Sequence, residues 1–197
     1  MIQKASFFVT KWLLQAGAIS IEDKDLYEYA AYSFLFSLIP LFMAFIFGLA
    51  LDMVTEGFLM ILPFMFIRKF SGGLHLKSAK ACLISSSVLL ISLFLLIKMT
   101  HIYTAYFFCS VAVFLFAIQL FMLSPIDSEA RRLSEKERFV FRKVARIIVV
   151  LSCFIYFALA ALKLYNIAVP VGYGIMLSGL LQLPCFFNLW FLHRYTQ

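Results

Sequence analysis

Long runs of apolar residues alternate with short polar segments along the whole chain. The runs cover about residues 30–51, 58–67, 82–97, 102–123, 147–163 and 168–192. Most of them approach the roughly 20 apolar residues that a helix needs to cross a bilayer. The pattern therefore predicts an all-α, polytopic membrane helical bundle of about six transmembrane helices, with residues 1–197 forming a single integral membrane domain.

Two segments depart from this simple pattern. The run 58–67 is short and contains Pro63, so it is either a short span or a re-entrant segment. Residues 1–20 have apolar side chains at helical spacing, with Lys4 and Lys11 on another face. This spacing predicts an amphipathic helix that lies in the membrane interface or packs on the bundle.

Polar signals mark where two of the helices begin. Ser20 followed by Asp23, and Ser134 followed by Glu137, have the spacing of a helix start at which the Ser side chain caps the first turn. The second signal predicts a helix that begins inside the polar loop 124–146 and continues into the next span.

The composition supports a membrane protein and argues against a nucleic-acid partner. Of the 197 residues, 64% are hydrophobic and 14% are charged, against about 25% charged residues in a typical soluble domain. Most of the net charge of +7 falls between the apolar runs. Because Lys and Arg collect in the cytoplasmic loops of membrane proteins, topology explains this excess without nucleic acid.

The positions of the basic residues also predict the orientation of the chain. The most basic loop, 124–146, belongs in the cytoplasm by the positive-inside rule. If the run 58–67 crosses the membrane, counting spans brings the basic segment 68–82 and both termini to the same side. We therefore predict a multi-pass protein of the cell membrane with both termini in the cytoplasm.

The segment 68–82, RKFSGGLHLKSAKAC, carries the residue types of a catalytic site. His75 and Cys82 lie ~10 Å apart along a straight helix, which is too far for a hydrogen bond. Gly72 and Gly73 tolerate backbone angles that would fold a loop carrying His75 back over the start of the next span. A Cys near a helix N-terminus, with Lys side chains and an imidazole close by, has the surroundings that favour a thiolate.

A thiolate beside an imidazole is the pair of groups that a cysteine peptidase uses. The same residues also have a simpler explanation, because a His in a basic loop is usually solvated and a Cys at the start of a span usually packs. A zinc site needs three or four ligands. His101 is expected on the opposite face and His193 has no evident partners, so the residues predict neither a metal nor any other cofactor.

The pattern R-x-x-x-G-G-x-H-x-x-x-x-x-x-C, at Arg68, Gly72, Gly73, His75 and Cys82, resembles the accessory gene regulator B family. The likeness extends to the chain length, the spacing of the spans and the basic loop after Ser-Pro. Members of that family are membrane-embedded cysteine endopeptidases of Gram-positive bacteria, and they process a small pro-peptide into a cyclic quorum-sensing signal. The resemblance implies that Cys82 attacks a peptide carbonyl, while His75 activates the thiol and protonates the departing amine.

The resemblance also implies a cyclising step and a set of partners. A substrate Cys or Ser attacks the acyl-enzyme thioester and closes a thiolactone or lactone ring. The expected partners are a pro-peptide with an amphipathic N-terminal helix and an acidic C-terminal tail, membrane lipid, and a second copy of the chain in a homodimer. Supporting roles at the site fall to Arg68, Gly72, Gly73 and Ser78, the last as the helix cap before Cys82. The residues expected to attract the acidic tail or lipid headgroups are Lys69, Lys77, Lys80, Arg131 and Arg132.

Two other functions compete with a peptidase. A non-enzymatic peptide exporter or channel would not need Cys82, but no predicted span carries a charged residue deep in its centre, as ion and proton pathways often do. A membrane enzyme acting on lipid would use acidic residues or metal, and the acidic residues here form no ligand-spaced set. Gln119 and Asn188, near the ends of spans, either orient His75 or bridge helices as buried amides often do.

Overall fold

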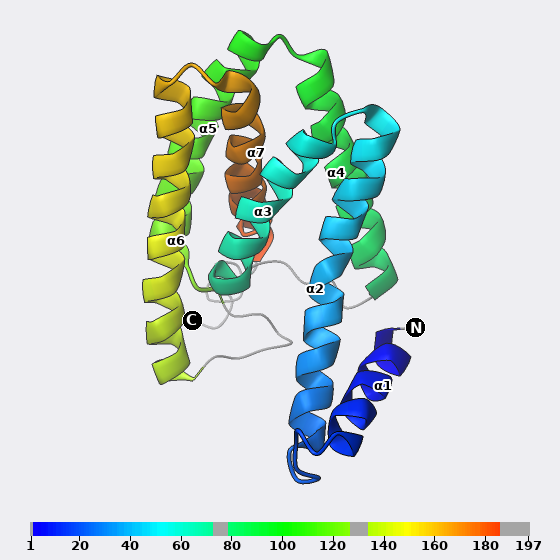
Figure 1. Ribbon diagram of the computed structural model, residues 1–197. Helices are drawn as coiled ribbons and strands as arrows, with labels where there is room; N and C mark the ends of the chain where they lie inside the picture. Colours follow the sequence, from blue (N-terminus) through cyan, green and yellow to red (C-terminus); the bar gives the residue numbers. More distant parts are fainter. Residues whose placement is uncertain (1, 73–78, 127–133, 186–197) are drawn as a thin grey trace. The chain divides into compact units, whose positions relative to one another are not determined.

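The structure, a computed structural model, describes residues 2–72, 79–126 and 134–185, and its regular elements there are all helices (Figure 1). In chain order they are α1 (Ile2–Gln15), α2 (Lys24–Leu51), α3 (Val54–Ser71), α4 (Ala79–Met99), α5 (Ile102–Leu123), α6 (Glu135–Ala161) and α7 (Tyr165–Leu180). The prediction of an all-α membrane bundle is confirmed.

The predicted spans correspond to helices α2 through α7. Within the described residues, four helical segments are long and apolar enough to cross a membrane. They are Lys24–Leu51, Ile102–Leu123, Glu135–Ala161 and Tyr165–Cys185. The apolar part of α4, Ile84–Met99, is shorter, and α3 has charged residues at both ends of its apolar run.

Helix α3 shows how the run 58–67 is built. It is one continuous helix of 18 residues that passes through Pro63. At 1.5 Å per residue its length is ~27 Å, close to the ~30 Å thickness of a hydrocarbon core. The uninterrupted helix therefore favours a short span over a re-entrant segment, which would need a reversal of the chain.

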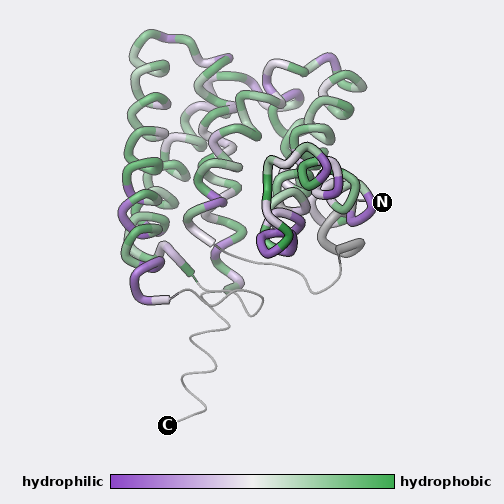
Figure 2. The backbone as a smooth tube through the Cα atoms, turned by 60° about the horizontal axis from the view of Figure 1, so that its bottom comes forward, coloured by the Kyte–Doolittle hydropathy of each residue, from purple (hydrophilic) through white to green (hydrophobic). Residues whose placement is uncertain are grey.

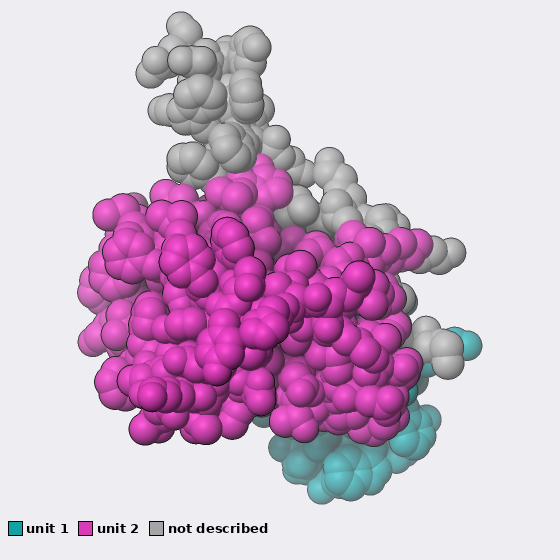
Figure 3. All heavy atoms as spheres, turned by 90° about the horizontal axis from the view of Figure 1, so that it is seen from above, with its two compact units in different colours: residues 1–43 teal, residues 44–197 magenta. Residues whose placement is uncertain are grey.

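The chain forms two compact units, which Figure 3 colours separately: residues 1–43 and residues 44–197. The first unit contains α1 and most of α2, and the Lys24 ammonium lies 5.8 Å from the centre of the Phe7 ring. Phe8 and Trp12 of α1 are 71% and 61% exposed. The helix predicted within residues 1–20 is thus present as α1, and its place at the membrane interface stays a prediction.

In the second unit, α7 packs against α3, α5 and α6 and is the most buried of the candidate spans (Figure 1). Glycines allow this close approach. A Cβ added at Gly174 would overlap the Met60 carbonyl of α3, and one added at Gly172 would overlap the Cys109 sulfur of α5. Small residues at helix contacts are the usual means by which membrane helices pack closely.

Large apolar side chains cover the outer surface of the second unit. Phe108 of α5 is 66% exposed and Phe154 of α6 is 69% exposed. Figure 2 shows hydrophobic residues predominating along the helices of this unit. An outer surface this apolar suits contact with lipid tails, because a soluble monomer rarely exposes extensive apolar surface.

The C-terminal ends of α3, α5 and α7 meet at one end of the second unit. The Ile126 N–H, just after α5, donates to the Ser71 carbonyl at the end of α3, and Gln182, just after α7, donates to the same carbonyl. The first half of α6 also lies here, because Arg146 donates to the Phe121 carbonyl of α5. The basic ends of α3 and α6 therefore share one end of the bundle, as the predicted order of spans requires; the side of the membrane that they face stays a prediction.

The predicted cap of α6 is present. The Ser134 hydroxyl accepts the Glu137 N–H at 3.4 Å, and the Glu137 carboxylate accepts the Ser134 N–H at 3.0 Å.

Replacing Ser134 with Ala is expected to destabilise the first turn by ~1 kcal/mol, or about fivefold in its opening equilibrium. Amide hydrogen exchange over residues 135–138 should accelerate accordingly. As a control, Ser92→Ala on α4, whose hydroxyl donates to the Val88 carbonyl of its own helix, should leave that exchange unchanged; unaltered exchange in Ser134→Ala would contradict the cap.

Candidate functional site

Helix α3 ends at Ser71, so the predicted catalytic segment begins inside its last turn. Arg68 and Lys69 occupy that turn, where cations complement the negative end of the helix dipole. The Arg68 Nη1 donates to the Gly72 carbonyl oxygen at 3.2 Å. Arg68 therefore holds the residue at which the chain leaves the helix and enters the predicted His75 loop.

Gly72 has a backbone conformation that few other residues adopt. Its φ of 71° and ψ of −159° lie in a region accessible essentially to Gly alone. It pairs with Ile126 in an isolated parallel bridge, and the Ile126 N–H donates to the Ser71 carbonyl at 3.0 Å. A Cβ at Gly72 would overlap the Ile126 carbonyl oxygen. The segment after α5 thus requires a glycine at this position.

Gln182 links the three helix ends. Its side chain is fully buried, and its Nε2 donates to the Ser71 carbonyl at 3.2 Å and to the Ser124 hydroxyl at 3.1 Å. Its Oε1 is also buried and accepts no hydrogen bond from the part of the chain that the structure describes. We call Ser71, Gly72, Ser124, Ile126 and Gln182 the helix-end junction.

The predicted site residues differ in how much of them the structure describes. Arg68 and Gly72 are described together at the junction, and the Lys69 ammonium lies 5.7 Å from the centre of the neighbouring Phe70 ring. Cys82 and Lys80 lie in the first turn of α4, with their side chains outside the described part. Gly73, His75, Lys77, Ser78, Arg131 and Arg132 lie outside the described residues. The contact between His75 and Cys82 therefore stays a prediction.

The two amides considered from the sequence have different outcomes. Gln119 donates to the Gly179 carbonyl at 3.1 Å and so connects α5 to α7, which supports the helix-bridging alternative. Asn188 lies outside the described residues. Gln182 was not predicted from the sequence, although a single amide between apolar neighbours near the end of the last span was a usable signal.

Replacing Gln182 with Met tests the junction. Met has a similar length but donates no hydrogen bond, so Ser124 would be left buried without this partner. We expect the free energy of unfolding to fall by about 1–3 kcal/mol, measured by thermal unfolding in detergent. The matched control is Gln119→Met, which removes one hydrogen bond from a half-buried amide. A loss in the control as large as that in Gln182→Met would contradict a special role for the junction.

Comparison with known proteins gives consistent matches across most of the chain. A family model described as Accessory gene regulator B matches residues 6–185. A Clostridium perfringens (strain SM101 / Type A) protein named "Putative AgrB-like protein" is 24% identical over 187 residues, covering 92% of this chain and 87% of that protein. A second, "Putative AgrB-like protein 2" from Clostridium perfringens (strain 13 / Type A), is 25% identical over 184 residues, covering 90% and 86%. No solved structure matches the chain.

Proposed function

This chain belongs to the accessory gene regulator B family, and from that membership we propose that it is a membrane-embedded cysteine endopeptidase. It removes the C-terminal tail of a small pro-peptide and promotes cyclisation of the remaining core into a quorum-sensing signal. Membership of the family supports a role in quorum-sensing peptide processing. The cysteine mechanism and the residues that perform it are our proposal.

The proposed reaction proceeds through an acyl-enzyme. The Cys82 thiolate attacks the peptide carbonyl that precedes the tail, and the C–N bond breaks as His75 gives its proton to the departing amine. A thioester to Cys82 remains. A substrate Cys thiol or Ser hydroxyl then loses its proton to His75 and attacks this thioester, forming a new thioester or ester within the peptide and releasing Cys82. With a substrate Cys, ring closure exchanges one thioester for another, so the second step is nearly balanced in free energy.

The observation that carries this proposal is the match of the family model over residues 6–185, which include the whole motif from Arg68 to Cys82. The start of α4 at Ala79 supports the role of Cys82. A residue in the first turn of a helix lies at the positive end of the helix dipole, which favours a thiolate over a thiol. The fixed position of Gly72 gives the proposed His75 loop a defined starting point.

We propose that the substrate tail is acidic and approaches the basic end of the bundle. Lys69 lies in the last turn of α3, and Lys77, Lys80, Arg131 and Arg132 follow in or near the adjoining loops. A cluster of one sign of charge raises the local concentration of an oppositely charged ligand. The amphipathic N-terminal helix of the pro-peptide and a homodimer of the enzyme belong to the same proposal.

Purified protein in liposomes, mixed with candidate pro-peptides encoded near its gene, tests the function directly. We expect mass spectrometry to detect the released tail peptide. A short-lived adduct with the mass of the peptide core should map to Cys82 after rapid acid quenching. If the pro-peptide crosses the liposome membrane intact and no tail is released, the exporter alternative replaces the peptidase.

A further inference from the structure

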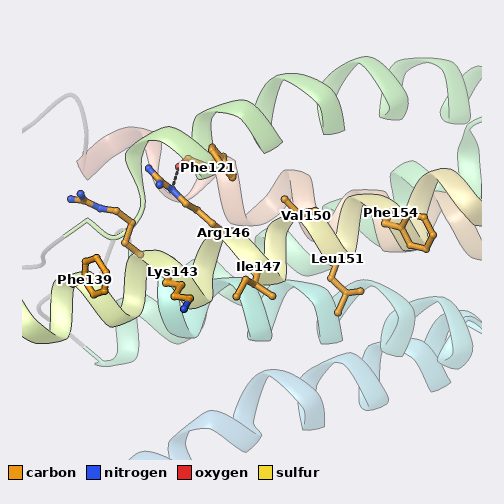
Figure 4. Close-up of a pocket in the computed structure, with 9 residues that line it drawn as sticks. Phe121, Phe139, Lys143, Arg146, Ile147, Val150, Leu151 and Phe154 are labelled. Carbon is orange, nitrogen blue, oxygen red and sulfur yellow. Dashed lines mark hydrogen bonds between the residues drawn. The ribbon is translucent and has the colours of Figure 1, made fainter.

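A groove with a volume of about 800 Å³ runs along the outer face of α6. Figure 4 shows that Phe121 of α5 lines one side of it, while the other labelled side chains come from α6. The groove lies within the second unit and extends from the end of the bundle where α5 ends and α6 begins to Phe154 in the second half of α6. The proposed peptidase chemistry does not use these residues.

One end of the groove is strongly basic. Arg142, Lys143 and Arg146 line it, and its described lining includes no acidic side chain. Arg146 is held in place, because its Nε donates to the Phe121 carbonyl at 3.2 Å and its guanidinium lies 4.8 Å from the centre of the Phe121 ring. A guanidinium has five N–H donors, and one of them makes this bond. Arg146 can therefore hold α5 and still present donors to an anion.

The rest of the groove is apolar and open. Ile147, Val150 and Leu151 are 56%, 57% and 55% exposed, and Phe154 is 69% exposed. From Arg142 to Phe154 the helix rises ~18 Å, slightly more than one leaflet, which is roughly 15 Å or half of a hydrocarbon core. The groove therefore has cations at one end and an apolar surface about one leaflet long.

We propose that this groove binds one anionic phospholipid. The phosphate lies against Arg142, Lys143 and Arg146, and an acyl chain follows Ile147 and the apolar residues beyond it. The basic end is the predicted cytoplasmic end, and basic pockets between helices on the cytoplasmic side of membrane proteins bind anionic headgroups. The ligand class follows from this pairing of charge and apolar length. The inference rests on the membrane fold and not on the proposed peptidase function.

A second copy of the chain fits this groove less well. In a two-fold symmetric dimer the same patch meets itself, so Arg142 and Lys143 of one protomer would face the same cations of its partner. Like charges in contact across an interface are unfavourable. An acidic peptide could satisfy the cations, but the apolar part is continuous with other exposed apolar side chains of α6, a surface that suits an acyl chain better than an acidic peptide.

Native mass spectrometry of the full chain in detergent tests the proposal. The probes are dioleoyl phosphatidylglycerol and dioleoyl phosphatidylcholine, supplied in equal amounts. We expect wild-type protein to retain one phosphatidylglycerol in preference to phosphatidylcholine. Because each cation near an anionic headgroup contributes about fivefold in affinity, R142Q/K143Q should lose roughly thirtyfold of this preference. The matched control is K136Q/R138Q, which removes the same charge from the same helix outside the groove lining and should keep the preference.

Three outcomes would overturn the proposal. One is equal binding of the two lipids by the wild type. Another is an equal loss of preference in K136Q/R138Q, which would indicate a general effect of charge. A third is a change in the ratio of dimer to monomer in R142Q/K143Q without any change in bound lipid, which would assign the groove to a second copy.

Thermal unfolding of each variant identifies any that are misfolded. Val150→Trp, which fills the apolar part and keeps all charges, should also displace the lipid.

Discussion

Replacing Cys82 with Ala is expected to abolish release of the substrate tail. Without a thiolate no acyl-enzyme forms, so both cleavage and ring closure lose their covalent route. Removal of a catalytic nucleophile commonly lowers the rate by ~10⁴-fold or more, which is below detection in a liposome assay followed by mass spectrometry. The trapped adduct should disappear in parallel with the tail peptide.

His75→Ala should be nearly as inactive, because the thiol then lacks its base and the amine its proton donor. The chain offers two matched controls. Cys109 is buried on α5, where its sulfur bonds the Val169 carbonyl, and Cys153 lies half-buried on α6. Cys109→Ala and Cys153→Ala should both keep cleavage within a few-fold of the wild type. Tail release by Cys82→Ala would show that the motif is structural and would leave the exporter as the better hypothesis.

Gly72→Ala is expected to have the next largest effect. By themselves, the backbone angles at position 72 would cost a residue other than Gly about 1–3 kcal/mol. The new methyl group would also overlap the Ile126 carbonyl. The chain would have to release its bridge to the segment after α5. Because a small displacement of a catalytic group costs roughly a hundredfold in rate, we expect tail release to fall by about that factor and the Tm in detergent to fall as well.

Gly17→Ala is the control that introduces backbone strain without the overlap that an added Cβ causes at position 72. Gly17 also has a positive φ, 68°, but a Cβ there meets no other atom within 4 Å. This variant should show a modest loss of stability and normal tail release. If Gly72→Ala keeps both its Tm and its activity, the bridge between Gly72 and Ile126 does not position the site.

Local sequence signals were sufficient for the helices. The apolar runs predicted α2 through α7. A segment inside a bilayer has no water to bond its backbone N–H and C=O groups, so it bonds them internally as a helix. Ser134 and Glu137 predicted the start of α6 for an equally local reason, since a cap involves only neighbouring residues. The pattern from Arg68 to Cys82 predicted the family, which the match over residues 6–185 confirms.

Tertiary structure decided how the site is anchored. The sequence showed that Gly72 is a glycine near a candidate catalytic His. The need for glycine arises from Ile126, which follows α5 and pairs with Gly72 at the end of α3. Gln182 lies more than one hundred residues from Ser71 along the chain and bonds its carbonyl. The groove on α6 likewise depends on the end of α5, where Phe121 fixes Arg146. Hydropathy and spacing determine each helix separately, whereas contacts between distant residues depend on how the side chains of different helices fit together.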